Sequence, residues 1–68
     1  MIFNHDFSRF NAVSDYQPSI EAELALSVGD LICVLEDFHD GWMAGVEEES
    51  GRLGLFPARC VERLGGRL

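Results

Sequence analysis

The sequence contains no lysine, so five arginines alone face twelve acidic residues and leave a formal net charge of -7. Binding to nucleic acid depends on neutralising phosphates with Lys and Arg. The charge balance therefore argues against nucleic acid, RNA included, and against anionic membranes, and it favours a basic peptide as partner. The arginines between residues 59 and 67 are too sparse to reverse this balance, and we expect that short stretch to be solvated.

Cysteine is also scarce, because Cys33 and Cys60 are the only two and neither belongs to a Cys-x-x-Cys motif. A disulfide between them is possible in principle, but a secreted domain this small usually carries about four or more cysteines. We therefore expect two reduced thiols in a cytoplasmic protein. No run of about eighteen apolar residues is present, and Met1 to Asn4 lack the features of a signal peptide, so we expect no membrane segment.

The chain is too short for a deep active site. Its 68 residues make one small domain. Such a domain buries only about 60% of its unfolded surface and leaves little room for a catalytic cavity, so we expect no enzyme activity. The pairs His5–Asp6 and His39–Asp40 lie in separate segments, so we expect no metal site either.

Short extended segments separated by turn signals make up most of the chain. Runs of apolar residues predict strands over residues 10–13, 24–26, 31–35, 42–46, 52–56 and 61–64. Between them we expect a long loop over 15–23, a polar loop over 36–41, and turns over 28–30, 47–51 and 57–60. Short strands at roughly ten-residue spacing predict an all-β protein, a small closed or sandwich-like barrel.

Four segments occur in an order and spacing that point to a family. Residues 10–16 are similar to an Ala-Leu-Tyr-Asp-Tyr opening, and residues 23–30 to a Glu-Leu-Ser-Phe strand followed by Gly-Asp. Residues 40–42 are similar to Asp-Gly-Trp-Trp, and residues 51–57 to Gly-Arg-x-Gly-Leu-Phe-Pro. The chain thus resembles the SH3 domain family over about residues 10–64, with residues 1–9 as an N-terminal extension and 65–68 as a C-terminal tail.

This resemblance implies a small five-stranded SH3-type β-barrel with no cofactor, no catalysis, and a groove for proline-rich peptides in polyproline II form. It places Trp42 at the rim of the groove, where the ring packs against proline and the indole N–H bonds a peptide carbonyl. Tyr16 and Pro57 complete the aromatic floor. Without the resemblance, Trp42 is explained equally well as a core residue.

Acidic residues are expected beside these aromatic rings. By resemblance, Glu21 and Glu23 lie in the loop that receives an Arg or Lys of the ligand, because a carboxylate binds a guanidinium through two parallel hydrogen bonds. For Glu21, a plain solvated loop position is an equal alternative. In the next loop Asp40, together with Glu36 and Asp37, extends the negative field.

The sequence departs from the family pattern at three groove positions. Ser14 and Cys60 stand where the family has tyrosines, and Arg59 replaces an asparagine that bonds the peptide backbone. We therefore expect one proline pocket to be weakened, although all three residues keep peptide-facing positions. Burial of one apolar side chain contributes roughly 1.5–3 kcal/mol, so ordinary PxxP binding is expected to be weaker by about tenfold or more.

Alternation along the strands predicts the core and leaves an apolar surplus. If Ile32 and Val34 point inward, as the family pattern implies, Leu31 and Cys33 point outward. That outer face is a contact surface for another domain, or residues 1–8 cover it. The predicted core consists of Ala12, Leu24, Leu26, Ile32, Val34, Gly45, Phe56 and Val61, to which we add Val28 and Leu55.

The sequence therefore predicts a monomeric, non-catalytic protein-interaction module of a larger cytoplasmic signalling or scaffold protein. In the first reading it binds a peptide containing proline and arginine through a partial groove. In the alternative, it is a structural module that docks another folded domain of the same chain or of a partner. An RNA-binding barrel would need a basic face that this sequence lacks.

Overall fold

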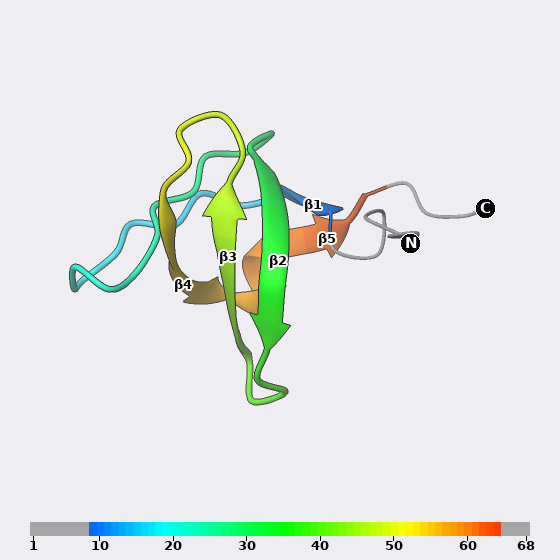
Figure 1. Ribbon diagram of the computed structural model, residues 1–68. Coiled ribbons are helices and arrows are strands. Elements are labelled where there is room, and N and C mark those ends of the chain that lie inside the picture. The colour runs from blue at the N-terminus through cyan, green and yellow to red at the C-terminus, as the bar shows by residue number, and fades with distance from the viewer. Residues whose placement is uncertain (1–8, 65–68) are drawn as a thin grey trace, which may run out of the picture.

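The computed structural model describes residues 9–64, which form five strands and a short 3-10 helix (Figure 1). The elements are β1 (Arg9–Ala12), β2 (Leu31–Asp37), β3 (Trp42–Glu47), β4 (Leu53–Pro57), the helix η2 (Ala58–Cys60) and β5 (Val61–Arg63). The strands form one antiparallel sheet in the order β4-β3-β2-β1-β5, which confirms the predicted five-stranded, all-β class. No helix between residues 9 and 64 is long and apolar enough to cross a membrane.

The strand predicted over residues 24–26 is wrong. This segment makes only isolated bridges, Glu23 with Leu55 and Leu26 with Tyr16. Glu23 and Leu26 pair with different parts of the chain, so the segment forms no continuous ladder of hydrogen bonds with one neighbouring strand.

The limits of the other strands differ from prediction by a few residues. β1 already begins at Arg9, and β2 continues to Asp37 because its last residues pair with β3 beyond a β-bulge. The tight turn predicted over residues 57–60 is the 3-10 helix η2.

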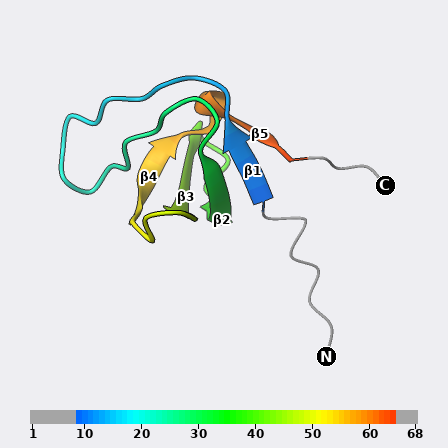
Figure 2. The ribbon, with the colours of Figure 1, turned by 90° about the horizontal axis from the view of Figure 1, so that it is seen from above.

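Residues 13–30, which we call the arm, connect β1 to β2, and Figure 2 shows the two halves of the arm running side by side. Tyr16 and Leu26 exchange two backbone hydrogen bonds of 2.9 and 3.1 Å, which hold the halves together. The arm closes in the predicted turn at residues 28–30, where the N–H of Asp30 donates to the carbonyl of Ser27 at 2.9 Å. Gly29 has a φ of 96° in this turn, a conformation that glycine adopts without strain.

The core agrees with the predicted alternation except at a few positions. Val28 is 63% exposed, because it lies in the turn of the arm, so its predicted burial is wrong. Val34 and Leu55 are half-buried. Met43 was not predicted, but it pairs in register with buried Phe56 and therefore faces the core. The buried apolar residues are Phe10, Ala12, Leu24, Leu26, Ile32, Met43, Phe56, Cys60 and Val61.

Gly54 allows the arm to lie directly against β4. The backbone of Leu55 accepts a hydrogen bond from the N–H of Leu24 at 2.7 Å and donates one to the carbonyl of Ala22 at 3.0 Å. A Cβ atom on Gly54 would lie only 2.9 Å from both the backbone nitrogen and the Cβ of Leu24. The absence of a side chain at this position therefore fixes where Glu23, between Ala22 and Leu24, meets the sheet.

We expect Gly54→Ala to lower the free energy of unfolding by about 1–3 kcal/mol, the usual cost of overpacking. The added methyl group meets backbone atoms of the arm, which have little room to move. Thermal unfolding followed by circular dichroism measures the change, with Ser27→Ala at an exposed arm position as the control. Equal melting temperatures for the two variants would contradict the close approach.

Candidate functional site

Three of the predicted site residues form one cluster. Tyr16 on the arm and Trp42 at the start of β3 meet edge to face, with ring centroids 6.2 Å apart and planes at 81°. The hydroxyl of Tyr16 donates a hydrogen bond of 2.7 Å to Oε1 of Glu23. All three residues are half-buried, so their remaining surface is open to a ligand.

A tight loop before β3 positions Trp42. The N–H of Trp42 donates to Oδ1 of Asp40 at 3.1 Å, and its carbonyl accepts a hydrogen bond of 3.1 Å from the N–H of Phe38. Gly41 has a φ of 101°, and its carbonyl accepts a hydrogen bond of 2.8 Å from the N–H of Ala58 in η2. One carboxylate oxygen of Asp40 is therefore engaged in holding the backbone of Trp42.

Glu23 is ordered by two donors to the same oxygen, because the N–H of Ser19 also donates to Oε1 at 3.0 Å. The hydrogen bonds from Tyr16 and Ser19 stabilise the ionised carboxylate and lower the pKa of Glu23. The hydrogen bond to Glu23 is in turn the main reason why the pKa of Tyr16 is raised. At neutral pH the pair is thus a carboxylate and a neutral phenol, while Glu21 nearby is exposed.

The three departures from the family pattern lie close together. The carbonyl of Cys60 accepts hydrogen bonds from the N–H groups of Val13 at 2.8 Å and Ser14 at 3.3 Å. Ser14 and Arg59 are exposed. Cys60 is only 3% exposed and packs in the hydrophobic core, so its predicted contact with peptide is wrong. A small thiol fits among the core side chains and supports the site from inside.

Pro57 also differs from prediction, because less than 2% of it is exposed. It pairs with Trp42 across β3 and β4. Pro57 therefore supports the strand ends beside Trp42 and offers no surface to a ligand.

Two exposed apolar side chains in the loops of the site were not predicted. Ile20 is 58% exposed, and its carbonyl accepts a hydrogen bond of 3.1 Å from the N–H of Glu23. Phe38 is 47% exposed and bonds the backbone of Trp42. The sequence signal for both residues is a large apolar side chain inside a polar loop. Ile20 and Phe38 each add exposed apolar surface to a loop that carries a site residue.

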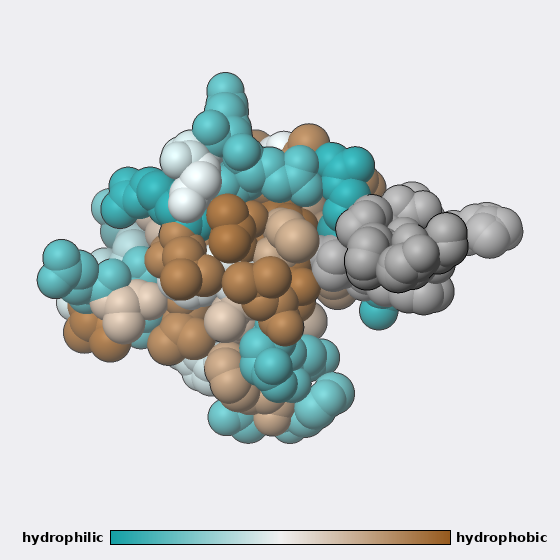
Figure 3. All heavy atoms as spheres, in the orientation of Figure 1, coloured by the Kyte–Doolittle hydropathy of each residue, from teal (hydrophilic) through white to brown (hydrophobic). Residues whose placement is uncertain are grey.

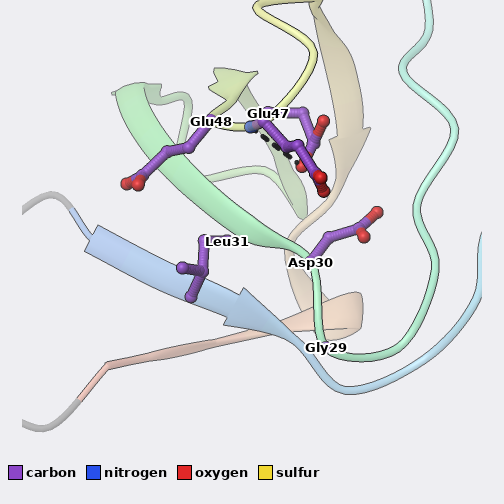
Figure 4. Close-up of a pocket in the computed structure, with 6 residues that line it drawn as sticks. Gly29, Asp30, Leu31, Glu47 and Glu48 are labelled. Carbon is purple, nitrogen blue, oxygen red and sulfur yellow. Dashed lines mark hydrogen bonds between the residues drawn. The ribbon is translucent and has the colours of Figure 1, made fainter.

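A depression of about 400 Å³ lies at the end of β3 that is remote from Trp42 (Figure 4). Two of its acidic residues already have structural partners. Glu47 accepts hydrogen bonds from the N–H groups of Ser50 at 2.9 Å and Glu49 at 3.3 Å, and hydrogen bonding from the side chain and then the backbone of Ser50 is the main reason why the pKa of Glu47 is lowered. Glu48 accepts two 3.0 Å hydrogen bonds from Arg9. Glu47 therefore stabilises the hairpin turn, and Glu48 links the hairpin to β1. The lining residues are Gly29, Asp30, Leu31, Glu47, Glu48 and Glu49.

The histidine and cysteine side chains form no metal centre in the part of the chain that the structure describes. Among residues 9–64, no group of three or more His, Cys, Asp or Glu side chains is arranged to hold a metal ion. No disulfide joins Cys33 and Cys60. The His5–Asp6 pair lies outside the described residues.

The chain is similar in sequence to known proteins. A family model described as variant SH3 domain matches residues 12–62. The Sorbin and SH3 domain-containing protein 1 homolog of Caenorhabditis elegans is 43% identical over 54 residues, which are 79% of this chain. The match spans only 5% of the length of that relative.

Solved structures share the fold closely. The SH3 domain of yeast NBP2 has a TM-score of 0.79 and 28% identity, covering 85% of this chain and 98% of that one. The C-terminal SH3 domain of myosin IB from Entamoeba histolytica, bound to an EhFP10(GEF) peptide, has a TM-score of 0.73 and 30% identity. This match covers 82% of the present chain and 90% of the myosin domain.

The lowered pKa of Glu23 predicts a specific loss of stability in acid. The ionised carboxylate stabilises the fold fully above the unfolded-state pKa of about 4.3, and this contribution is lost as the pH falls through the lower, folded-state pKa. Between about pH 5 and pH 3, the melting temperature should therefore fall more steeply in wild type than in Glu23→Gln. Thermal unfolding followed by Trp42 fluorescence measures the slopes.

Glu21→Gln is the matched control, because Glu21 is an exposed acid in the same loop. It should keep the wild-type slope. If Glu23→Gln kept that slope as well, the hydrogen bonds to Glu23 would not stabilise the fold.

Proposed function

The chain belongs to the SH3 domain family, and on that premise we propose that it binds a short peptide containing proline and arginine, as a module of a larger signalling or scaffold protein. SH3 domains in general are non-catalytic interaction modules. A larger parent protein is supported by the Caenorhabditis elegans relative, of which the match spans 5%. We also propose that the domain is monomeric. A location in the cytoplasm is supported by the low number of cysteines, because a secreted domain of this size usually carries more.

The cluster of Tyr16, Trp42 and Glu23 is the observation that carries this proposal. Flat aromatic faces pack against proline, and the indole N–H is a donor for a peptide carbonyl. The carboxylate of Glu23 is ionised and only half-buried, so its negative charge remains available to a ligand cation. Together with exposed Glu21, it forms an acceptor for guanidinium next to the aromatic rings. The peptide bound to the myosin IB domain supports a peptide as the ligand.

The groove we propose is partial. Ser14 carries no ring, and the side chain of Cys60 is buried, so neither residue offers an aromatic wall at this end. The ligand therefore gains one proline pocket at Trp42 and Tyr16. Because the second proline pocket is lost, we expect part of the binding free energy to come from charged groups of the ligand.

A second candidate function is the docking of another folded domain on the outer face of the sheet. Cys33, Val46 and Leu53 pair in one register row, so their side chains share a face. Leu53 is 66% exposed and Leu35 59% exposed, and Figure 3 shows apolar surface gathered over β2, β3 and β4. An exposed apolar surface of this kind is favourable for protein contact. Residues 1–8, the other expected cover of this face, lie outside the described residues.

Two substitutions separate the groove from the outer face. Trp42→Ala should weaken binding of a peptide containing proline and arginine by at least about tenfold, because the half-buried ring gives most of its remaining surface to the ligand. Leu53→Asp should leave the same binding unchanged. Calorimetric titration measures both affinities, and thermal melting shows whether each variant stays folded.

The reverse pattern would favour the outer face as the binding surface. If Trp42→Ala abolished the melting transition, Trp42 would be a core residue and the groove model would be wrong.

Peptide binding should also depend on charge. Glu23→Gln keeps an oxygen that accepts the Tyr16 hydroxyl but removes the negative charge, and we expect about tenfold weaker binding of an arginine-containing peptide. Glu49→Gln removes the same charge on the distant hairpin and should have little effect. Raising the salt concentration should weaken wild-type binding, because ions screen exposed charges over about 8–10 Å. An affinity that does not change with salt would exclude an arginine anchor.

A further inference from the structure

Arg59 lies at a defined point of the site, between the loop that carries Trp42 and the start of the arm. On one side of Arg59, the N–H of Ala58 donates to the carbonyl of Gly41 at 2.8 Å. On the other side, the carbonyl of Cys60 accepts the N–H of Ser14 at 3.3 Å. These bonds fix the short helix η2, while the side chain of Arg59 remains exposed.

The charge of Arg59 is not neutralised within the described part of the chain. The ion pairs between residues 9 and 64 are Arg9 with Glu48 and, when His39 is protonated, His39 with Asp37. Arg59 forms neither. Arg59 is thus an exposed guanidinium without an acidic partner among the described residues, in a chain that carries more than twice as many acidic as basic residues.

The two charged groups near Tyr16 belong to different elements of the fold. The hydroxyl of Tyr16 is hydrogen-bonded to Glu23, which raises its pKa, while the positive charge of Arg59 acts on the same hydroxyl in the opposite direction. Glu23 approaches from the returning half of the arm, and Arg59 from η2. A peptide lying over Tyr16 and Trp42 therefore meets a carboxylate from the arm and a guanidinium from η2.

A guanidinium has only donors, and its planar fork matches a carboxylate through two parallel hydrogen bonds. The exposed side chain of Ser14 beside it adds a hydroxyl that is able to donate to the same group. We propose that the ligand of this site is a peptide with charges of opposite sign, whose cationic residue faces Glu21 and Glu23 and whose Asp or Glu side chain faces Arg59 and Ser14. This inference rests on the proposed peptide-binding function.

Two opposite charges also determine the direction of the bound chain. In the reversed direction the peptide would place its own cation against Arg59 and its carboxylate against Glu23, and like charges in an interface are unfavourable. The site should therefore accept one order of the two charged residues and reject the other.

Synthetic peptides test this proposal directly. The first pair is Arg-Ala-Pro-Pro-Ala-Glu and the same peptide with Gln in place of Glu. The second pair has the reversed order, Glu-Ala-Pro-Pro-Ala-Arg, again with Gln in place of Glu in its second member. All four are acetylated and amidated, and calorimetric titration at low salt measures their affinity. In one of the two orders, we expect the Glu peptide to bind wild type about tenfold more tightly than the Gln peptide, as for a charge-assisted hydrogen bond.

Variants assign that difference to one side chain. In Arg59→Gln the preference for the Glu peptide should disappear, whereas Arg52→Gln, at an exposed position next to the distant hairpin, should keep it. If the Glu and Gln peptides bound wild type equally in both orders, the inference would be wrong while peptide binding itself would stand. If none of the four peptides bound, the proposed function would fail, and this inference with it.

Discussion

The contact between the arm and β4 is the constraint on which the site depends. Two backbone hydrogen bonds of Leu55, to Leu24 and Ala22, hold the returning half of the arm against the edge strand. They form only because Gly54 has no side chain in the space that the Leu24 backbone occupies. This contact places Glu23 within hydrogen-bond distance of Tyr16, and Tyr16 in turn packs against Trp42. A backbone contact in one corner thus arranges the three side chains that a ligand would meet.

Acidic residues have different roles at the two ends of β3. At the hairpin end, Glu47 caps backbone N–H groups of the turn and Glu48 pairs with Arg9, so these charges stabilise local structure. At the site, Oε1 of Glu23 accepts hydrogen bonds from Tyr16 and Ser19 while the side chain stays half-buried, and Glu21 is exposed. The number of acids in a segment therefore says little about binding. Whether each carboxylate is already hydrogen-bonded decides what it is able to accept.

The site residues show which features could be predicted from the sequence and which could not. The order and spacing of the motifs were sufficient to predict that Tyr16, Trp42 and Glu23 share one site, and the structure brings them into contact. The same motifs placed Pro57 and Cys60 on the groove surface, where the structure buries both. Their exposure depends on what packs beside β4 and η2, and a small thiol leaves room for the core to enclose it. A motif read at the level of the family cannot supply this information.

The sequence by itself determined the turns, most strand positions, the alternation that buries Ile32 and Phe56, and the strongly negative charge. These properties depend on neighbouring residues and on residue type, so they can be read along the chain. Only the tertiary structure decided that Glu23 and Leu26 pair with different partners in place of forming a strand, and which residues of the groove remain exposed. Such features arise from contacts between segments remote in sequence, where packing and backbone hydrogen bonding override local preference.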